Sequence, residues 1–283
     1  MDTITITQQT RAETLRALHH GPSPLILPNA WDVVSARLFE EAGCRAIGTT
    51  SAGIAATLGY PDGERAPRDE LLAVVGRIAR AVTVPMTADI EAGYGDTPAE
   101  AARTARAVIA VGAVGLNLED GTGDPARPLM DTASQVAKIR AVREAAVAAG
   151  LPLVLNARTD VYWLAVGDAH GRFAAAVERL RAYRAAGADC LFVPGVGDGE
   201  TIGRLVRAVD GPLNVLAGAE TPAIADLGRL GVRRVSVGSA PLRATLGLVR
   251  RIADELLRQG TYTRMTTDAI PYAEVNQLLA ARA

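Results

Sequence analysis

Three carboxylates stand where two neighbouring β-strands are expected to end. Asp89 and Glu91 come at the end of the apolar run 84–89, and Glu119 ends the run 114–119. Residues two apart in a strand point to the same side, and neighbouring strands lie about 4.8 Å apart, so these acids should converge. Converging carboxylates without His or Cys favour Mg²⁺ or Mn²⁺ over Zn²⁺. We predict a divalent metal site at Asp89, Glu91 and Glu119, although isolated acids in such positions often cap helices or stay solvated.

Arg158 ends another predicted strand, 153–158, next to the strand of Glu119. Its planar guanidinium can bind a carboxylate or a phosphonate through two parallel hydrogen bonds. It can equally pair with Glu119 or Asp160, and its position alone does not separate these interpretations.

A turn of small residues and two asparagines are further candidates for substrate contacts. The turn follows the run 46–50, and its backbone N–H groups and hydroxyls can hold an anion, although tight packing explains small residues equally well. Asparagines at strand ends can bind substrate or hold loops. The candidates are Thr50, Ser51, Ala52, Gly53, Asn29 and Asn214.

Several side chains that often carry catalysis are scarce. The only lysine, Lys138, does not end a predicted strand, so a Schiff-base mechanism is disfavoured. His19 and His20 are expected on the surface and His170 near the start of a helix, so a histidine general base is not expected. Two cysteines in 283 residues indicate a reducing, cytoplasmic setting in which both thiols are small buried side chains.

The elements that must position these residues alternate regularly. Helical stretches end near a glycine, and each is followed by a short apolar run typical of a parallel strand covered on both faces. Eight such runs predict a (β/α)₈ TIM barrel. A doubly wound open sheet is the weaker alternative, because no GxGxxG follows the first run. The runs span 25–28, 46–50, 84–89, 114–119, 153–158, 190–194, 213–217 and 235–238.

Amphipathic segments separate these runs. Thr97 and Thr221 each precede a proline and are expected to be helix N-caps. No linker or low-complexity stretch interrupts the pattern, so residues 1–283 are expected to form a single barrel domain with extra N- and C-terminal helices. Helices are predicted over 31–43, 97–112, 132–150, 172–187 and 223–231, with the extra ones at 11–20 and 272–282.

Composition excludes several other classes of protein. The chain has 30 basic and 31 acidic residues, without the basic surplus that nucleic-acid binding usually requires. The longest apolar stretch, around 107–118, is too short and too interrupted to span a membrane. We therefore expect neither a nucleic-acid nor a membrane partner.

Four segments, GTTSAGIAATLGYPD, VPMTADIEAGYG, GLNLEDG and NARTD, occur in this order along the chain. Together they resemble the isocitrate lyase/phosphoenolpyruvate mutase superfamily over about residues 25–260. The second segment is the most specific, because it is similar to the family's V-P-x-x-x-D-x-D/E-x-G-Y-G. The resemblance implies a (β/α)₈ barrel, Mg²⁺, small 2-oxo acid or phosphonate substrates, and a homodimer or homotetramer that exchanges its last helix between subunits.

The resemblance also implies roles for individual residues. Asp89 corresponds to the principal metal carboxylate, and Glu91 occupies the place where the family often has a second Asp. Glu119 would hold metal-bound water. Arg158 and the turn 50–53 would bind the substrate, with the turn's N–H and hydroxyl groups on its carboxylate.

One loop departs from the family pattern. The lyases carry Lys-Lys/Arg-Cys-Gly-His after the fourth strand, whereas residues 119–131 here read EDGTGDPARPLMD. This loop also lacks the Lys and Asn expected of a phosphoenolpyruvate mutase. Isocitrate or methylisocitrate cleavage and the mutase reaction are therefore disfavoured by their usual routes. Gly121, Gly123 and Pro125 disfavour regular structure, so the loop can still act as a lid.

The predicted function is a Mg²⁺-dependent, lyase-type reaction on a small 2-oxo acid or dicarboxylate. Carbon–carbon cleavage or decarboxylation would pass through an enolate, with Arg158 and Glu119 as the catalytic residues. Water or the loops of Tyr94 and Tyr60 would return a proton to the enolate. Two alternatives stay open: phosphonopyruvate hydrolysis or a phosphonomutase reaction, and a catalytically inactive barrel that binds 2-oxo acids.

Overall fold

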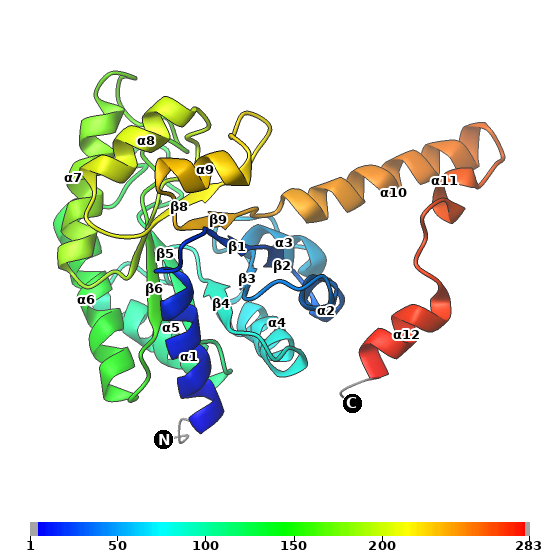
Figure 1. Ribbon diagram of the computed structural model, residues 1–283, viewed down its shortest axis with the longest axis horizontal. Helices are drawn as coiled ribbons and strands as arrows, with labels where there is room; N and C mark the ends of the chain where they lie inside the picture. The colour runs from blue at the N-terminus through cyan, green and yellow to red at the C-terminus, as the bar shows by residue number, and fades with distance from the viewer. Residues whose placement is uncertain (1–4, 281–283) are drawn as a thin grey trace.

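All strands pair in parallel and run around a barrel that helices surround (Figure 1). The computed structural model describes residues 5–280. The strand order is β1-β9-β8-β7-β6-β5-β4-β3-β2. The strands are β1 (Leu25–Leu27), β2 (Asn29–Ala30), β3 (Ile47–Thr49), β4 (Met86–Asp89), β5 (Gly115–Glu119), β6 (Val154–Arg158), β7 (Cys190–Phe192), β8 (Leu213–Leu216) and β9 (Arg234–Ser236).

A proline divides the first strand, and the barrel closes through its two halves. Pro28 has no backbone N–H and separates β1 from β2. β1 pairs with β9, with Leu25 opposite Arg234, whereas β2 pairs with β3. Each of the eight predicted runs overlaps a strand, so the predicted (β/α)₈ TIM barrel is confirmed.

Helices cover the outside of the barrel and connect its strands. They are α1 (Ile6–Leu18), α2 (Val33–Glu41), α3 (Ser51–Leu58), α4 (Arg68–Ala81), α5 (Pro98–Ala110), α6 (Thr132–Ala148), α7 (Arg172–Ala185), α8 (Gly199–Ala208), α9 (Ile224–Leu230), α10 (Ala240–Arg258), α11 (Thr263–Thr266) and α12 (Tyr272–Ala280). Residues 281 and 282 of the predicted last helix lie outside the described residues. No helix within residues 5–280 is long and apolar enough to cross a membrane.

The two predicted helix N-caps have different outcomes. Thr97 caps α5 as predicted, and its hydroxyl and the Glu100 carboxylate form a reciprocal capping box. Thr221 does not cap a helix, because α9 begins only at Ile224 and the Thr221 hydroxyl accepts the Gly218 N–H instead.

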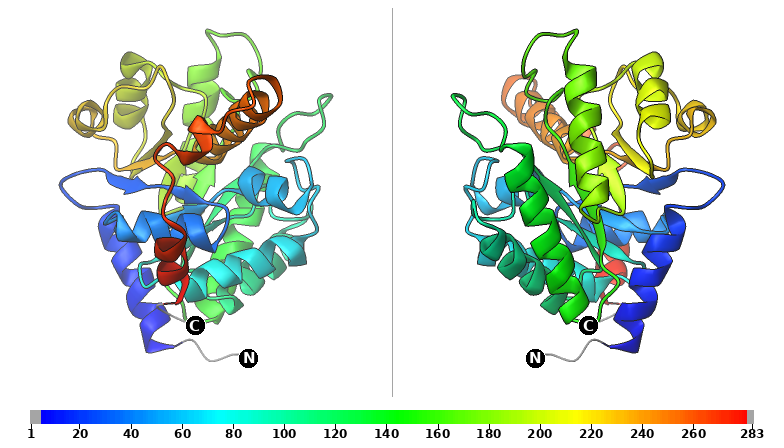
Figure 2. Two further views of the ribbon diagram at one scale, coloured as in Figure 1. Left: turned by 90° about the vertical axis from the view of Figure 1, so that its right-hand side faces the viewer. Right: turned by 90° about the vertical axis from the view of Figure 1, so that its left-hand side faces the viewer.

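The helix that follows β9 leaves the barrel. Figures 1 and 2 show α10 extending away from β9, with α11 at its far end, and α12 contacts α2. We call residues 240–280 the arm. Within α10, only Leu242 and Glu255 are buried. On the outer side of β1, the side chain of Ile26 stays 46% exposed.

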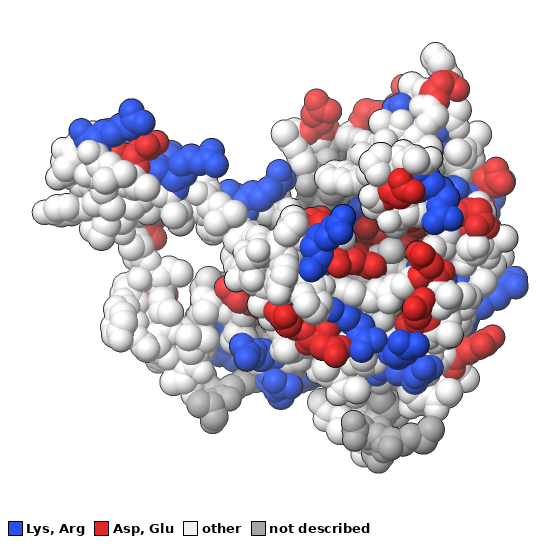
Figure 3. All heavy atoms as spheres, turned by 180° about the vertical axis from the view of Figure 1, so that it is seen from behind, with Lys and Arg blue, Asp and Glu red and all other residues white. Residues whose placement is uncertain are grey.

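Charges of both signs are interspersed over the face seen in Figure 3.

Beneath the barrel, α1 buries Ala12, Leu15 and Leu18. His19, predicted on the surface, is buried as well, with Nδ1 2.8 Å from the Leu15 carbonyl oxygen. The apolar spacing of α1 continues to this histidine, which explains its burial, and burial lowers its pKa to about 4.

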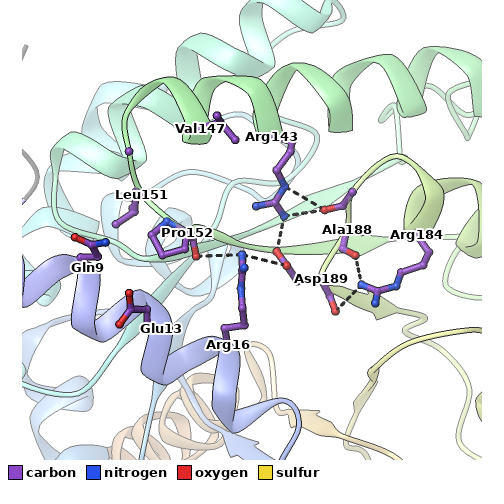
Figure 4. Close-up of a pocket in the computed structure, with 12 residues that line it drawn as sticks. Gln9, Glu13, Arg16, Arg143, Val147, Leu151, Pro152, Arg184, Ala188 and Asp189 are labelled. Atoms are coloured by element: carbon purple, nitrogen blue, oxygen red, sulfur yellow. Dashed lines mark hydrogen bonds and ion pairs between the residues drawn. The ribbon is translucent and has the colours of Figure 1, made fainter.

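Arginines around Asp189 hold the lower ends of β6 and β7 (Figure 4). The Asp189 carboxylate accepts the Leu155 N–H at 2.8 Å and pairs with Arg143 and with Arg16, the latter at 3.3 Å. Arg184 donates to the Ala188 carbonyl oxygen at 2.7 Å. These guanidiniums therefore lie against a carboxylate and carbonyl groups at the start of the two strands.

Asp189→Ala is expected to destabilise the barrel, because it leaves the Leu155 N–H and the Arg143 guanidinium without their carboxylate. The loss should be about 2–3 kcal/mol, or roughly 4–10 °C in the thermal midpoint measured by circular dichroism. Asp210→Ala removes an exposed aspartate from the end of α8 and is the control. Equal midpoints for the two variants would contradict this role.

Candidate active site

The upper ends of the strands surround a small inner cavity of about 90 Å³. Its apolar wall consists of Trp163, Phe192, Pro194 and Leu216. The other lining residues are Asn29, Thr50, Ser51, Ala52, Asp62, Asp89, Asn117, Arg158, Ser236, Gly238 and Ser239. None of these lining residues is a lysine, histidine or cysteine, and a cavity of this size admits only a small molecule.

A wider outer chamber of about 590 Å³ adjoins the inner cavity and shares Ser51, Asp62, Arg158 and Trp163 with it. Six carboxylates line the chamber against a single guanidinium. They are Asp62, Glu64, Glu91, Glu119, Asp124 and Asp160, and the guanidinium is that of Arg158. This excess of negative charge would repel an acidic substrate unless a cation lies among the carboxylates.

Asp89 ends β4 and presents one oxygen with no partner. Its Oδ2 accepts hydrogen bonds from the Ser51 N–H at 3.1 Å and the Ser51 hydroxyl at 2.9 Å. Its Oδ1 is buried and has no hydrogen-bond partner among the described residues. Ser51 thus fixes the carboxylate while one oxygen stays available to a ligand.

Glu91 lies in the outer chamber, but the strand alternation used to predict its position is wrong. β4 ends at Asp89, and Glu91 adopts a left-handed backbone with φ +52°. Its Oε2 accepts the Glu64 N–H at 2.5 Å. Burial, followed by the charges of Asp62 and Asp89, raises the pKa of Glu91 to about 8. The carboxylates of Asp62, Asp89 and Glu91 therefore lie close enough to repel one another.

The single lysine supports the loop that carries Glu91. Lys138 is fully buried on α6, and its ammonium donates to the carbonyl oxygens of Ala92 and Gly95, the latter at 2.8 Å. Tyr94 in this loop also has a left-handed backbone, with φ +58°. Lys138 therefore holds a strained loop, and it is not among the residues that line either cavity.

Arg158 pairs with both neighbouring acids and still faces the cavities. Its Nη1 lies 2.7 Å from Glu119, and its Nε and Nη2 lie 2.6 and 3.1 Å from the two oxygens of Asp160. The parallel register places Glu119 directly opposite Arg158. These contacts use three of the five N–H donors of a guanidinium, which leaves two for a bound anion. Burial raises the pKa of Glu119, and Arg158 opposes that rise.

Three of the four residues of the turn 50–53 reach the inner cavity. Thr50, Ser51 and Ala52 line it, whereas Gly53 does not. The Gly53 N–H donates to the Thr50 hydroxyl at 3.3 Å, and a Cβ at this glycine would lie 2.5 Å from Thr50 Cγ2. Ala52 carries one of the unpaired N–H groups that begin α3, so it is the backbone donor best placed for an anion.

The side chains of the two predicted asparagines both contact protein groups. Asn29 lines the cavity, but its side chain holds the Thr49 carbonyl oxygen and the N–H groups of Val237 and Gly238. Asn214 is fully buried and absent from the lining, because it is the second residue of β8 rather than its end. Its Oδ1 accepts the Ser236 hydroxyl at 3.0 Å.

Sequence comparison identifies the family. The sequence model of the family described as phosphoenolpyruvate phosphomutase matches residues 15–257, most of the chain. This chain belongs to the phosphoenolpyruvate phosphomutase family. The resemblance drawn from the four sequence segments is thereby confirmed.

Relatives in the superfamily act on several small acids. An oxaloacetate decarboxylase from Bradyrhizobium sp. (strain BTAi1) is 32% identical over 252 residues, which are 84% of this chain and 82% of the relative. A 2-methylisocitrate lyase from Escherichia coli K12 is 30% identical over 219 residues, which are 74% and 71% of the two chains. A crystal structure from Burkholderia cenocepacia J2315, described only as a lyase or mutase, has a TM-score of 0.91 at 40% identity and covers 98% of both chains.

The site fits a divalent metal ion. Asp89 Oδ1 is a buried, unpartnered oxygen surrounded by surplus negative charge. Within residues 5–280, no three acidic, histidine or cysteine side chains lie close enough to hold one ion directly. Mg²⁺ commonly takes one or two carboxylates and keeps several waters, so Asp89 as a direct ligand, with Glu91 and Glu119 reached through water, suits this ion.

Sequence reasoning missed Asp62, Asn117 and Ser236, which all line the inner cavity. Asn117 lies two residues before Glu119 on β5, so strand alternation could have found it. Asp62 lies in an irregular loop after α3, and no sequence pattern placed it in the cavity. The suggested proton donors Tyr94 and Tyr60 line neither cavity, and the Tyr60 hydroxyl lies 3.3 Å from Glu70.

Proposed function

We propose that this family member is a Mg²⁺- or Mn²⁺-dependent enzyme that breaks a carbon–carbon bond of a small 2-oxo dicarboxylate such as oxaloacetate. The observation that carries this proposal is the composition of the inner cavity. Asp89 Oδ1, the Ala52 N–H and the two remaining N–H groups of Arg158 all belong to residues that line about 90 Å³. The name of the decarboxylase relative supports a substrate of this class.

Decarboxylation fits the missing acid and base better than lyase cleavage of a hydroxy acid. A hydroxy acid needs a base to take its hydroxyl proton, whereas loss of CO₂ from C4 of oxaloacetate, β to its 2-oxo group, leaves an enolate without prior proton removal. The loop 119–131 contains no cysteine, lysine or histidine, and neither does the inner cavity. Water can then return the proton to the enolate.

The residues of this chain have distinct roles in the proposed reaction. Arg158 and the Ala52 N–H bind the substrate carboxylate, and Ser51 keeps Asp89 oriented. Glu119 keeps the guanidinium of Arg158 in place. The apolar wall limits the size of the acid that fits the inner cavity. A divalent ion held by Asp89, with Glu91 and Glu119 reached through water, would supply positive charge against the negative charge that develops on the substrate.

Product analysis with Mg²⁺ tests this proposal. Oxaloacetate should give CO₂ and pyruvate, or oxalate and acetate if the cleavage is hydrolytic. Phosphonopyruvate is the comparison substrate. Phosphate release from it, without cleavage of oxaloacetate, would reject the proposal in favour of P–C chemistry. Metal-dependent binding of 2-oxo acids without turnover of any of them would favour an inactive binding barrel.

We also propose that the arm packs on a second copy of the chain to form a homodimer or homotetramer. The arm is long and leaves large apolar side chains in solvent. Its exposed residues include Leu246, Val249, Leu256, Leu257, Tyr262 and Tyr272. Because α10 does not fold back, Ile26 on the outer side of β1 also stays exposed. Exchange of arms between two copies would bury both surfaces.

Leu257→Glu is expected to convert the oligomer to a monomer at micromolar concentration, measured by size exclusion with light scattering. This side chain is 86% exposed, so the charge should disrupt the contact between copies and leave the chain's own fold intact. Val147→Glu, at a 71% exposed position on α6, is the matched control and should leave the mass unchanged. An unchanged mass for Leu257→Glu would contradict the proposed contact.

A further inference from the structure

A guanidinium lies inside the barrel without an acidic partner among the described residues. Arg234 on β9 is fully buried, and its Nη1 has no hydrogen-bond partner among the described residues. None of the ion pairs formed by residues 5–280 includes it. Burial lowers its pKa only to about 10, so the group stays cationic near neutral pH. A buried charge without a partner destabilises a protein, so its presence requires a benefit other than stability.

Arg234 lies against two residues that line the inner cavity. Its Nη2 donates to Asn117 Oδ1 at 3.2 Å, and its Nε lies 3.4 Å from the Ser236 hydroxyl. Asn117 and Ser236 both belong to strands and form what we call the floor of the cavity. The guanidinium therefore lies directly beneath the place where an anionic substrate would bind.

Arg234 also determines which way the Asn117 amide points. A guanidinium has no acceptor, so the amide atom that faces it must be the oxygen. Asn156 confirms this orientation, because its Nδ2 donates to the same Asn117 oxygen at 2.8 Å. Asn117 Nδ2 has no hydrogen-bond partner within residues 5–280, yet it is not among the buried unpartnered atoms, so it faces the cavity. The floor thus presents an N–H donor rather than an acceptor.

We infer that Asn117 is a substrate-binding residue whose amide donates to an anionic oxygen of the ligand, and that Arg234 is the positioning residue that orients this amide and supplies positive charge beneath it. The inference rests on the proposed function, because it assumes that a small acid occupies the inner cavity. It explains why the cavity, surrounded by carboxylates, retains a buried cation on its opposite side.

The test compares ligand affinity with stability. Oxalate, a planar dianion similar to the enolate of a 2-oxo acid, is titrated calorimetrically in the presence of Mg²⁺, and thermal midpoints are measured without ligand. Arg234→Met should weaken oxalate binding at least tenfold, while the midpoint stays the same or rises because an unpaired charge is gone. Asn117→Asp should weaken binding at least as much, because it replaces the cavity-facing donor with a negatively charged acceptor and keeps an oxygen for Arg234.

Arg233→Met is the matched control, since Arg233 donates to the Gly21 carbonyl oxygen outside the cavity. Its oxalate affinity should equal that of the wild type. Unchanged oxalate affinity in Asn117→Asp, or a lower midpoint with unchanged affinity in Arg234→Met, would overturn the inference. Wild-type protein that binds oxalate but turns over no 2-oxo acid would reject the proposed reaction instead, and the binding comparison would remain decisive.

Discussion

Asp89→Asn is expected to lower kcat/KM at least about a thousandfold, which corresponds to about 4 kcal/mol of transition-state stabilisation. The substitution keeps the size of the side chain and an oxygen for the Ser51 donors, but it removes the charge from Oδ1. A neutral amide is a poor ligand for Mg²⁺, which prefers carboxylates. The loss should therefore come from the metal and not from a disturbed fold.

Measurements of metal binding distinguish loss of the metal from a disturbed fold. Mg²⁺ should raise the thermal midpoint of the wild type and not that of Asp89→Asn, since a ligand stabilises only a protein that binds it. Without Mg²⁺, the variant should be at least as stable as the wild type, because Asp89 is one of the charges that crowd Glu91. A chelator should abolish wild-type activity, and Mg²⁺ or Mn²⁺ should restore it.

Asp69→Asn is the control for Asp89→Asn, because Asp69 is an exposed carboxylate paired with the adjacent Arg68. It should leave activity and the response to Mg²⁺ unchanged. Full activity of Asp89→Asn, or the same Mg²⁺ stabilisation in this variant as in the wild type, would contradict the metal assignment and with it the proposed reaction.

The barrel could be predicted from the sequence because its signals are local. A parallel strand covered on both faces requires an apolar run, and the helix before it ends where a glycine permits the turn. The pairing of the two halves around Pro28 depends on β9 and β3, which lie elsewhere in the chain, and no local pattern specifies the course of the arm. The burial of His19 follows from the apolar spacing of α1 once this helix packs beneath the barrel, and that packing depends on the rest of the chain. That residues 1–283 form a single domain stays a prediction.

The site was predictable only where a residue's place in its strand was known. Asp89, Glu119 and Arg158 end their strands and therefore reach the cavities. Asn214 is the second residue of its strand and lies below the floor, so counting it as a strand end was wrong. Asp62 reaches the cavity through an irregular loop. Whether the loop 121–131 closes as a lid stays a prediction, although the Gly121–Leu129 bridge orders its base.

Arg158→Lys is expected to raise KM for the 2-oxo acid by about 10–100-fold. Arg158 makes charge-assisted contacts with Glu119 and with both oxygens of Asp160, and still has two N–H groups for the substrate. An ammonium cannot satisfy both acids and a substrate carboxylate in this planar arrangement. Loss of a hydrogen bond to a charged group commonly costs about 1.5–3 kcal/mol, which corresponds to this range of affinity.

Arg68→Lys is the matched control for Arg158→Lys, because Arg68 donates from both Nε and Nη2 to Asp69 on the exposed surface. The exposed pair is screened by solvent and lies outside both cavities, so KM and kcat should stay the same. A rise in KM confined to Arg158→Lys shows that the remaining N–H groups of Arg158 bind substrate. If Arg158→Lys loses thermal stability while KM and kcat stay at wild-type values, Arg158 only holds Glu119 and Asp160 together, and the substrate carboxylate must then be bound by the turn alone.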